Sequence, residues 1–78
     1  MRTIERQKKL LYIARAYVGY QVTQAIETSD ASKTDKEMMT RIVNARYNHD
    51  SWFMFCHADD KLKESLLDII EKTYYGDM

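Results

Sequence analysis

The chain has 78 residues, with no proline, two glycines, one cysteine and equal numbers of basic and acidic residues. This length supports one small domain, 1–78, and the scarcity of turn residues argues against an all-β fold, which needs turns roughly every eight to twelve positions. A single cysteine excludes an intrachain disulfide, and a net charge of zero is unlike that of a typical nucleic-acid-binding domain.

The first predicted helix runs from Ile4 to about Glu27, with Thr3 as N-cap, because a hydroxyl accepts from the free amides of a first turn. Apolar residues that recur every seven positions form a stripe for the protein's own core: Ile4, Leu11, Val18 and Ala25, flanked by Leu10, Ala14, Tyr17 and Gln21. A second stripe follows at a spacing of four: Tyr12, Ala16 and Tyr20. Two stripes on one helix predict two partners, and we interpret Gly19 as a place where another backbone approaches closely.

The polar segment 28–37 marks the clearest break. Thr34 and Glu37 stand in capping-box spacing, so a second helix is predicted to start there. At residues 48–51 two alternatives are open: the helix continues to about His57, or Asp50 caps a short new helix. One continuous, bent helix is favoured, because no proline interrupts it.

The segment 52–56, WFMFC, has five consecutive apolar residues, which cannot all lie on one helix face. Some of them must be internal, and Cys56 is interpreted as a small buried hydrophobe. A last helix is predicted between Asp59 as N-cap and Gly76 as terminator. The sequence therefore predicts an all-α fold: a small three-helix domain, a long antiparallel helical hairpin plus a C-terminal helix. Its surplus of apolar surface predicts a homo-oligomer.

Charge is unevenly distributed along the chain. Residues 1–15 hold five basic side chains against one acidic, whereas residues 59–78 hold six acidic against three basic. Such a pattern favours antiparallel packing of the first and last helices, or head-to-tail contact between subunits. The alternative is that both segments are simply solvated.

No catalytic or metal-binding motif is recognisable. His49, Cys56, His57, Asp59 and Asp60 are possible ligands, but the recurring zinc spacings are missing, and there is neither a glycine-rich phosphate loop nor a nucleophile with an assignable base. We therefore expect no enzyme activity, no metal and no cofactor. The apolar run 10–22 is too short for a bilayer and lacks a cleavage site, which favours a cytoplasmic location, in the cell of origin or in a host.

Large adaptable side chains suggest function through binding. The candidate partner- or ligand-binding residues are Lys8, Tyr12, Arg15, Tyr20 and Trp52. The leading hypothesis is a small non-catalytic regulatory or inhibitory interaction protein, of the phage or plasmid accessory type, that binds a protein partner through an exposed aromatic helix face. Arg15 would there meet an anion or an acidic partner. One alternative is an oligomeric sponge that holds an anionic nucleotide, such as a cyclic dinucleotide, in an intersubunit cleft; another is a nucleic-acid-binding regulator.

Overall fold

Five helices and no strand make up residues 2–76, the part of the chain that the computed structural model describes. They are α1 (Ile4–Ala16), α2 (Gly19–Glu27), α3 (Lys33–Val43), α4 (Asn48–His57) and α5 (Asp60–Tyr75). The all-α class is thus confirmed. The prediction of three helices is wrong, because each of the two long predicted helices is divided in two.

The helix ends mostly follow local sequence signals. The Thr3 hydroxyl and the Asp59 carboxylate each accept a hydrogen bond from a first-turn amide, and both predicted N-caps are therefore confirmed. Gly76 ends α5 with a φ of 77°, a conformation that favours glycine, as predicted. The predicted cap of α3 is two residues too late, since Ser32, not Thr34, accepts from the first turn.

The first predicted helix is interrupted at Tyr17 and Val18. Both of their amides donate to the Ile13 carbonyl, at 2.9 and 3.3 Å, so the chain leaves the helical path before α2 begins. A Cβ on Gly19 would lie 3.3 Å from the Ala14 carbonyl oxygen. Gly19 therefore does permit a close backbone approach, but the approaching backbone is the end of the preceding helix.

The second predicted helix is interrupted at residues 44–47. Tyr47 takes the N-cap position of α4 without a side-chain cap, and Asp50 lies inside the first turn. The favoured continuous helix is therefore wrong. The short new helix of the other alternative is present, but Tyr47, not Asp50, is its N-cap residue. The buried Ser51 hydroxyl donates to the Ile42 carbonyl at 2.7 Å, which fixes α4 against the end of α3.

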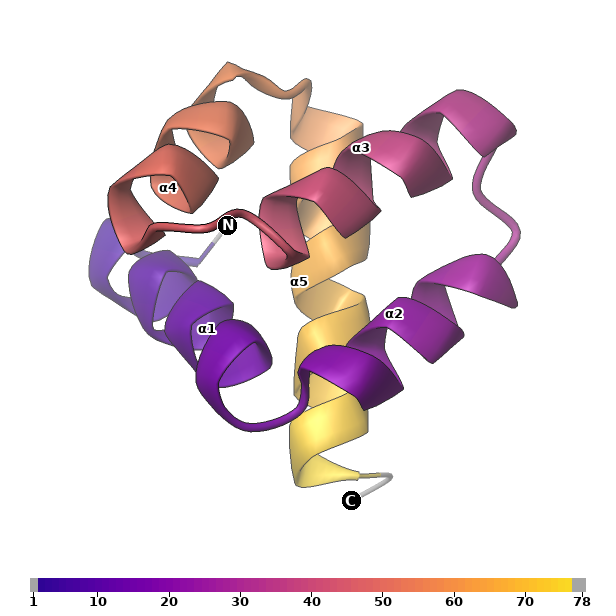
Figure 1. Ribbon diagram of the computed structural model, residues 1–78, viewed down its shortest axis with the longest axis horizontal. Helices are drawn as coiled ribbons and strands as arrows, with labels where there is room; N and C mark the ends of the chain where they lie inside the picture. The colour runs from indigo at the N-terminus through magenta and orange to yellow at the C-terminus, as the bar shows by residue number, and fades with distance from the viewer. Residues whose placement is uncertain (1, 77–78) are drawn as a thin grey trace.

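The helices pack as a globule rather than a hairpin. In Figure 1, α5 passes behind the other four helices, with α1 and α4 on one side and α2 and α3 on the other. The principal extents are 27, 26 and 25 Å. An unbroken helix from Thr34 to His57 would alone be about 36 Å long, at roughly 1.5 Å per residue. The long antiparallel hairpin is therefore excluded.

All five helices contribute to one apolar core. Its buried members are Leu10, Leu11, Ala14, Val22, Ile26, Met39, Ile42, Val43, Phe55, Leu62, Leu66, Leu67 and Ile70. The predicted core stripe is only partly correct, since Ile4 and Tyr17 are 62% and 65% exposed. From the WFMFC segment Phe55 is buried, but Phe53 and Cys56 are exposed, so the interpretation of Cys56 as a buried hydrophobe is wrong.

The basic N-terminal segment pairs with the acidic C-terminal helix within one chain. Arg2 forms ion pairs with Glu64, Asp68 and Glu71, at 3.0, 2.6 and 2.6 Å. Arg6, one turn later, pairs with Glu71 at 3.0 Å. The expected charge complementarity is present, but α1 and α5 run in the same general direction in Figure 1, so the antiparallel arrangement is wrong. None of the helices in residues 2–76 is long and apolar enough to span a bilayer.

Candidate partner-binding groove

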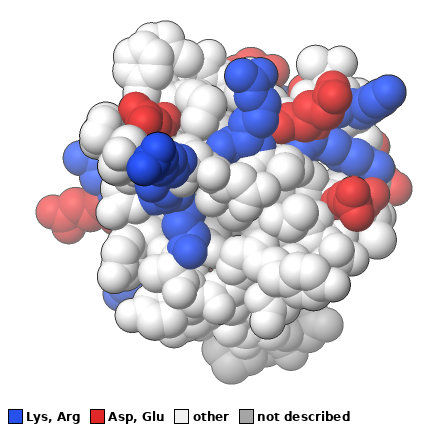
Figure 2. Space-filling view, viewed as in Figure 1, with Lys and Arg blue, Asp and Glu red and all other residues white. Residues whose placement is uncertain are grey.

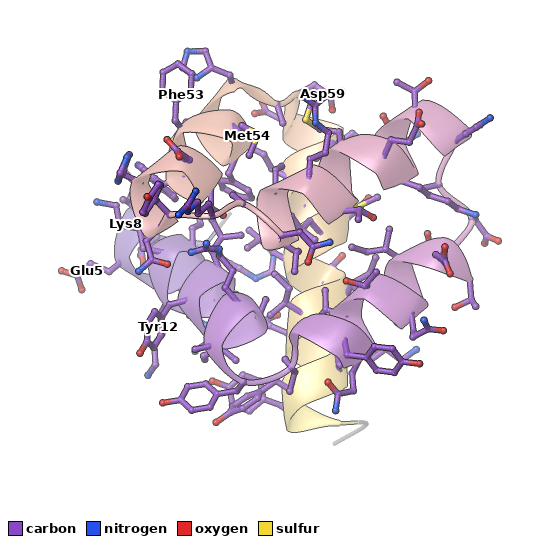
Figure 3. The ribbon with its side chains drawn as sticks, in the orientation of Figure 1. Glu5, Lys8, Tyr12, Phe53, Met54 and Asp59 are labelled. Carbon is purple, nitrogen blue, oxygen red and sulfur yellow. The ribbon has the colours of Figure 1, made fainter. Side chains whose placement is uncertain are left out.

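A groove of about 350 Å³ lies between α1 and α4. Its lining side chains are Lys8, Leu11, Tyr12 and Arg15 from α1, and Asn48, His49, Ser51 and Trp52 from α4. Figure 3 shows Lys8 and Tyr12 on the side of the molecule where α1 and α4 are adjacent. Four of the five predicted binding residues thus line one groove: Lys8, Tyr12, Arg15 and Trp52.

Helical periodicity explains the α1 wall. Residues 11 and 12 each lie three or four positions from both residue 8 and residue 15, so the four side chains project from one broad face of the helix. Leu11 is buried in the core, whereas Tyr12 is 50% exposed. The Tyr12 ring meets the Tyr17 ring edge to face, with centroids 6.1 Å apart. This wall therefore joins the core to an aromatic surface that is open to solvent.

Trp52 dominates the α4 wall. It is partly buried and stacks with the buried Phe55, with ring centroids 5.6 Å apart and planes 22° apart. The Lys8 ammonium lies 5.1 Å from the Trp52 ring centroid, within the range of a cation–π contact. The groove thus brings together an indole ring, a phenol ring and an ammonium group.

Arg15 has partners within the chain. Its guanidinium donates to the Asn48 side-chain oxygen and to the Ala45 carbonyl, and so ties the end of α1 to the turn before α4. Its Nε atom is buried and has no hydrogen-bond partner among the described residues. The expectation that only an external anion would engage Arg15 is therefore wrong, because the α3–α4 turn already does so.

Tyr20 lies outside the groove. The interruption at residues 17–18 places it on α2, where it is 75% exposed and does not line the groove. The spacing of four that related Tyr20 to Tyr12 holds only for a continuous helix. The predicted Tyr12–Ala16–Tyr20 stripe is therefore divided between two helices.

Three polar lining residues are not among the predicted ones: Asn48, His49 and Ser51. The His49 ring stacks on Tyr47 with centroids 5.5 Å apart, and its Nε2 lies 3.4 Å from the Asp50 carboxylate. The sequence contains no signal for these residues, because their role depends on α4 packing beside α1. The sequence shows only that residues 48–51 are poor helix formers, which leaves open whether a helix breaks there.

The exposed aromatic side chains lie in two kinds of surroundings, one with basic side chains nearby and one without. Figure 2 shows Lys and Arg gathered over the upper part of the visible face, while the described residues in its lower part include few charged side chains. Residues 16–26 contain no charged side chain, and this segment exposes Tyr17 and Tyr20. The α1–α4 groove differs from that region because it combines its aromatic rings with Lys8 and Arg15.

The geometry of the groove is the basis for assigning a function. Comparison of the chain with family models, curated proteins and solved structures gives no match. Within residues 2–76, no three His, Cys, Asp or Glu side chains are grouped so that they could hold a metal ion.

Proposed function

We propose that this protein is a small regulatory or inhibitory interaction protein that binds a protein partner in the α1–α4 groove. The observation that carries the proposal is the convergence of Tyr12, Trp52, Lys8 and Arg15 on one concave surface. Tyrosine, tryptophan and arginine are the residue types most often found at the energetic centres of protein interfaces.

The size of the groove favours one anchoring side chain of a partner. Its volume of about 350 Å³ lies near the lower end of the range of about 300–1,000 Å³ for small-molecule pockets. Tyr12 at its edge is half exposed, so a partner can bury further apolar area around the anchor.

The nucleotide sponge has less support than the protein partner. Within one chain, the groove is lined by one tryptophan, one tyrosine and two cationic side chains, and the Arg15 guanidinium already binds Ala45 and Asn48. A symmetric dinucleotide would need a second protomer to complete the cleft. Homo-oligomerisation stays a prediction of the sequence, which light scattering would test against the 9.3 kDa monomer.

A nucleic-acid-binding role is also less favoured. Of the five basic side chains in residues 1–15, Arg2 and Arg6 pair with α5 and Arg15 binds the α3–α4 turn. Only Lys8 and Lys9 of this group have no ion pair or hydrogen bond to side chains in the described residues. Two lysines provide little of the phosphate neutralisation on which such binding depends.

The matched tyrosines Tyr12 and Tyr20 provide a test. Both are exposed on helices, but only Tyr12 lines the groove. We expect Tyr12→Ala to weaken capture of a partner from the source cells by about tenfold. This corresponds to a loss of about 1.4 kcal/mol of binding free energy, as for a residue at the centre of an interface. Tyr20→Ala should capture the same partner as the unmodified protein, and circular dichroism should show unchanged helix content in both variants. Equal capture by Tyr12→Ala and the unmodified protein would reject the proposal.

A further inference from the structure

We infer that the segment bound in the α1–α4 groove is an acidic peptide, with a carboxylate beside a large apolar side chain. This inference rests on the proposed function and adds the chemistry of the partner. The carboxylate pairs with Lys8, and the apolar side chain packs against Trp52 and Tyr12.

The charges of the groove are complementary to an anion. Lys8 and Arg15 line it, and no aspartate or glutamate does. The carboxylate of Asp50 lies nearby, but it is 3.4 Å from the His49 ring and outside the lining. An acidic segment would therefore enter a groove of positive charge, without like-charge repulsion from the lining residues.

Lys8 is the cation that remains available. The hydrogen bonds of Arg15 to Ala45 and Asn48 would have to break before its terminal nitrogens could bind a ligand. Lys8, in contrast, is exposed, contacts the face of the Trp52 ring, and has no ion pair within residues 2–76. Its ammonium group has three donors and a flexible stem, so it can meet a carboxylate without loss of an internal bond.

The start of α4 adds to this preference for an anion. Thr3, Ser32 and Asp59 cap the helices α1, α3 and α5 with a side-chain acceptor. Tyr47 gives α4 no such acceptor, and neither does Val18 at the start of α2, which does not line the groove. Asn48 and His49, in the first turn of α4, line the groove. The partial positive charge of this helix N-terminus, offset in part by the Asp50 carboxylate in the same turn, thus acts at the same place as Lys8.

The walls of the groove favour a peptide over a free inorganic anion. Leu11, Tyr12 and Trp52 present mainly apolar surface, which a phosphate or sulfate ion would leave unused. A carboxylate next to a leucine or phenylalanine uses both the cation and the rings. This combination is the one that acidic, amphipathic segments of proteins offer.

Trp52 provides a direct signal, because it is the single tryptophan in the chain. A random library of twelve-residue peptides would be selected on the unmodified protein and on Lys8→Glu. Selected sequences would then be synthesised without tryptophan and titrated while Trp52 fluorescence is recorded. We expect selection on the unmodified protein to enrich aspartate or glutamate beside a large apolar residue.

Charge reversal at two neighbouring lysines tests the role of Lys8. Lys8→Glu should weaken binding of the acidic peptides by at least about tenfold, and Lys8→Gln should have a smaller effect of the same sign. Lys9→Glu is the matched control, because Lys9 is exposed on α1 but does not line the groove; its effect should be less than about threefold. Replacing glutamate by glutamine in the peptide should remove the difference in affinity between the unmodified protein and Lys8→Glu.

The outcomes separate this inference from the proposed function. Peptides that alter Trp52 fluorescence but carry no acidic enrichment, or that bind Lys8→Glu equally well, overturn the acidic partner and leave a protein partner in place. A fluorescence response to cyclic dinucleotides or to single-stranded RNA, with none to acidic peptides, overturns the inference in favour of a nucleotide ligand. If no peptide alters Trp52 fluorescence, the inference fails; if Tyr12→Ala also leaves partner capture unchanged, the proposed function fails with it.

Discussion

Basic side chains play opposite parts on the two flanks of α1. On the α5 flank, Arg2 and Arg6 are paired with carboxylates of the same chain. On the α4 flank, no carboxylate lines the groove, and Lys8 lies over an indole ring instead. Charges on the first flank therefore stabilise the fold, whereas Lys8 on the second is available for a partner. The comparison shows that a basic segment in a sequence is not by itself a binding surface, because part of its charge serves the fold.

The largest expected effect comes from a substitution in the core, because it destabilises both flanks of α1 together. Leu10 on α1 is fully buried in the core of the domain, and Leu10→Ala should reduce the free energy of unfolding by about 2–5 kcal/mol. A domain of this size has only about 4–12 kcal/mol in total, so the variant should be close to unfolding. Urea titration would follow helix content by circular dichroism and the groove by Trp52 fluorescence.

Both probes should report one transition for Leu10→Ala, because the flanks share one core. Ile4→Ala is the control, since Ile4 is 62% exposed and its loss should change stability by less than about 0.5 kcal/mol. Separate transitions for helix content and fluorescence would show that the groove is not built on the common core.

A smaller effect is expected on the α4 flank alone. Arg15→Ala removes the charged hydrogen bonds to Ala45 and Asn48 and should cost about 2 kcal/mol. Amide hydrogen exchange should accelerate in the turn 44–47 and in the first turn of α4, while α5 remains protected. Arg41→Ala is the matched control, because Arg41 is an exposed arginine in the last turn of α3. Unchanged exchange in the turn would mean that Arg15 does not hold it.

The smallest expected effect concerns the α5 flank. The hydrogen bond from Arg2, followed by that from Arg6, lowers the pKa of the Glu71 carboxyl below its ordinary value of about 4.5. A lowered folded-state pKa means that the ion pairs stabilise the fold above the ordinary pKa, and that this stability is lost as the pH falls through the lowered value. Glu71→Gln should therefore cost about 1 kcal/mol at neutral pH, and its difference from the unmodified protein should shrink in acid.

Urea unfolding at a series of pH values between about 7 and 3 would measure this difference for Glu71→Gln. Glu5→Gln is the control, because Glu5 is exposed on α1 and has no ion pair within residues 2–76. A difference for Glu71→Gln that does not change with pH would contradict the assignment of the α5 flank as a charge-stabilised contact.

Local signals in the sequence were sufficient for the helical class and for several helix ends. Thr3 and Asp59 can each accept a hydrogen bond from a first-turn amide, and Gly76 can adopt positive φ, wherever the rest of the chain lies. The position of the two internal breaks was not predictable in this way. Residues 44–47 contain no proline or glycine, and the turn there is held by Arg15 and Ser51, through contacts with Asn48, Ala45 and Ile42.

The candidate groove was predictable only in part, and for a similar reason. Lys8, Tyr12 and Arg15 share a face of α1 by helical periodicity, so the sequence could place them together. Trp52 was included among the predicted binding residues only because it is a large aromatic residue, and the sequence did not indicate where it would lie. The prediction missed His49 and Asn48 and wrongly included Tyr20. Their positions depend on where the chain turns, which the sequence did not indicate.

The sequence by itself determined that the chain is helical, where the first helix begins, where the last begins and ends, and that its basic N-terminal segment complements its acidic C-terminal segment. These properties arise from caps, periodicity and charge, which act over a few residues or through net composition. The tertiary structure decided the two breaks, the direction of α1 relative to α5, and which aromatic residues meet which cations. Those outcomes depend on contacts between residues far apart in the chain, such as Arg15 with Ala45 and Lys8 with Trp52.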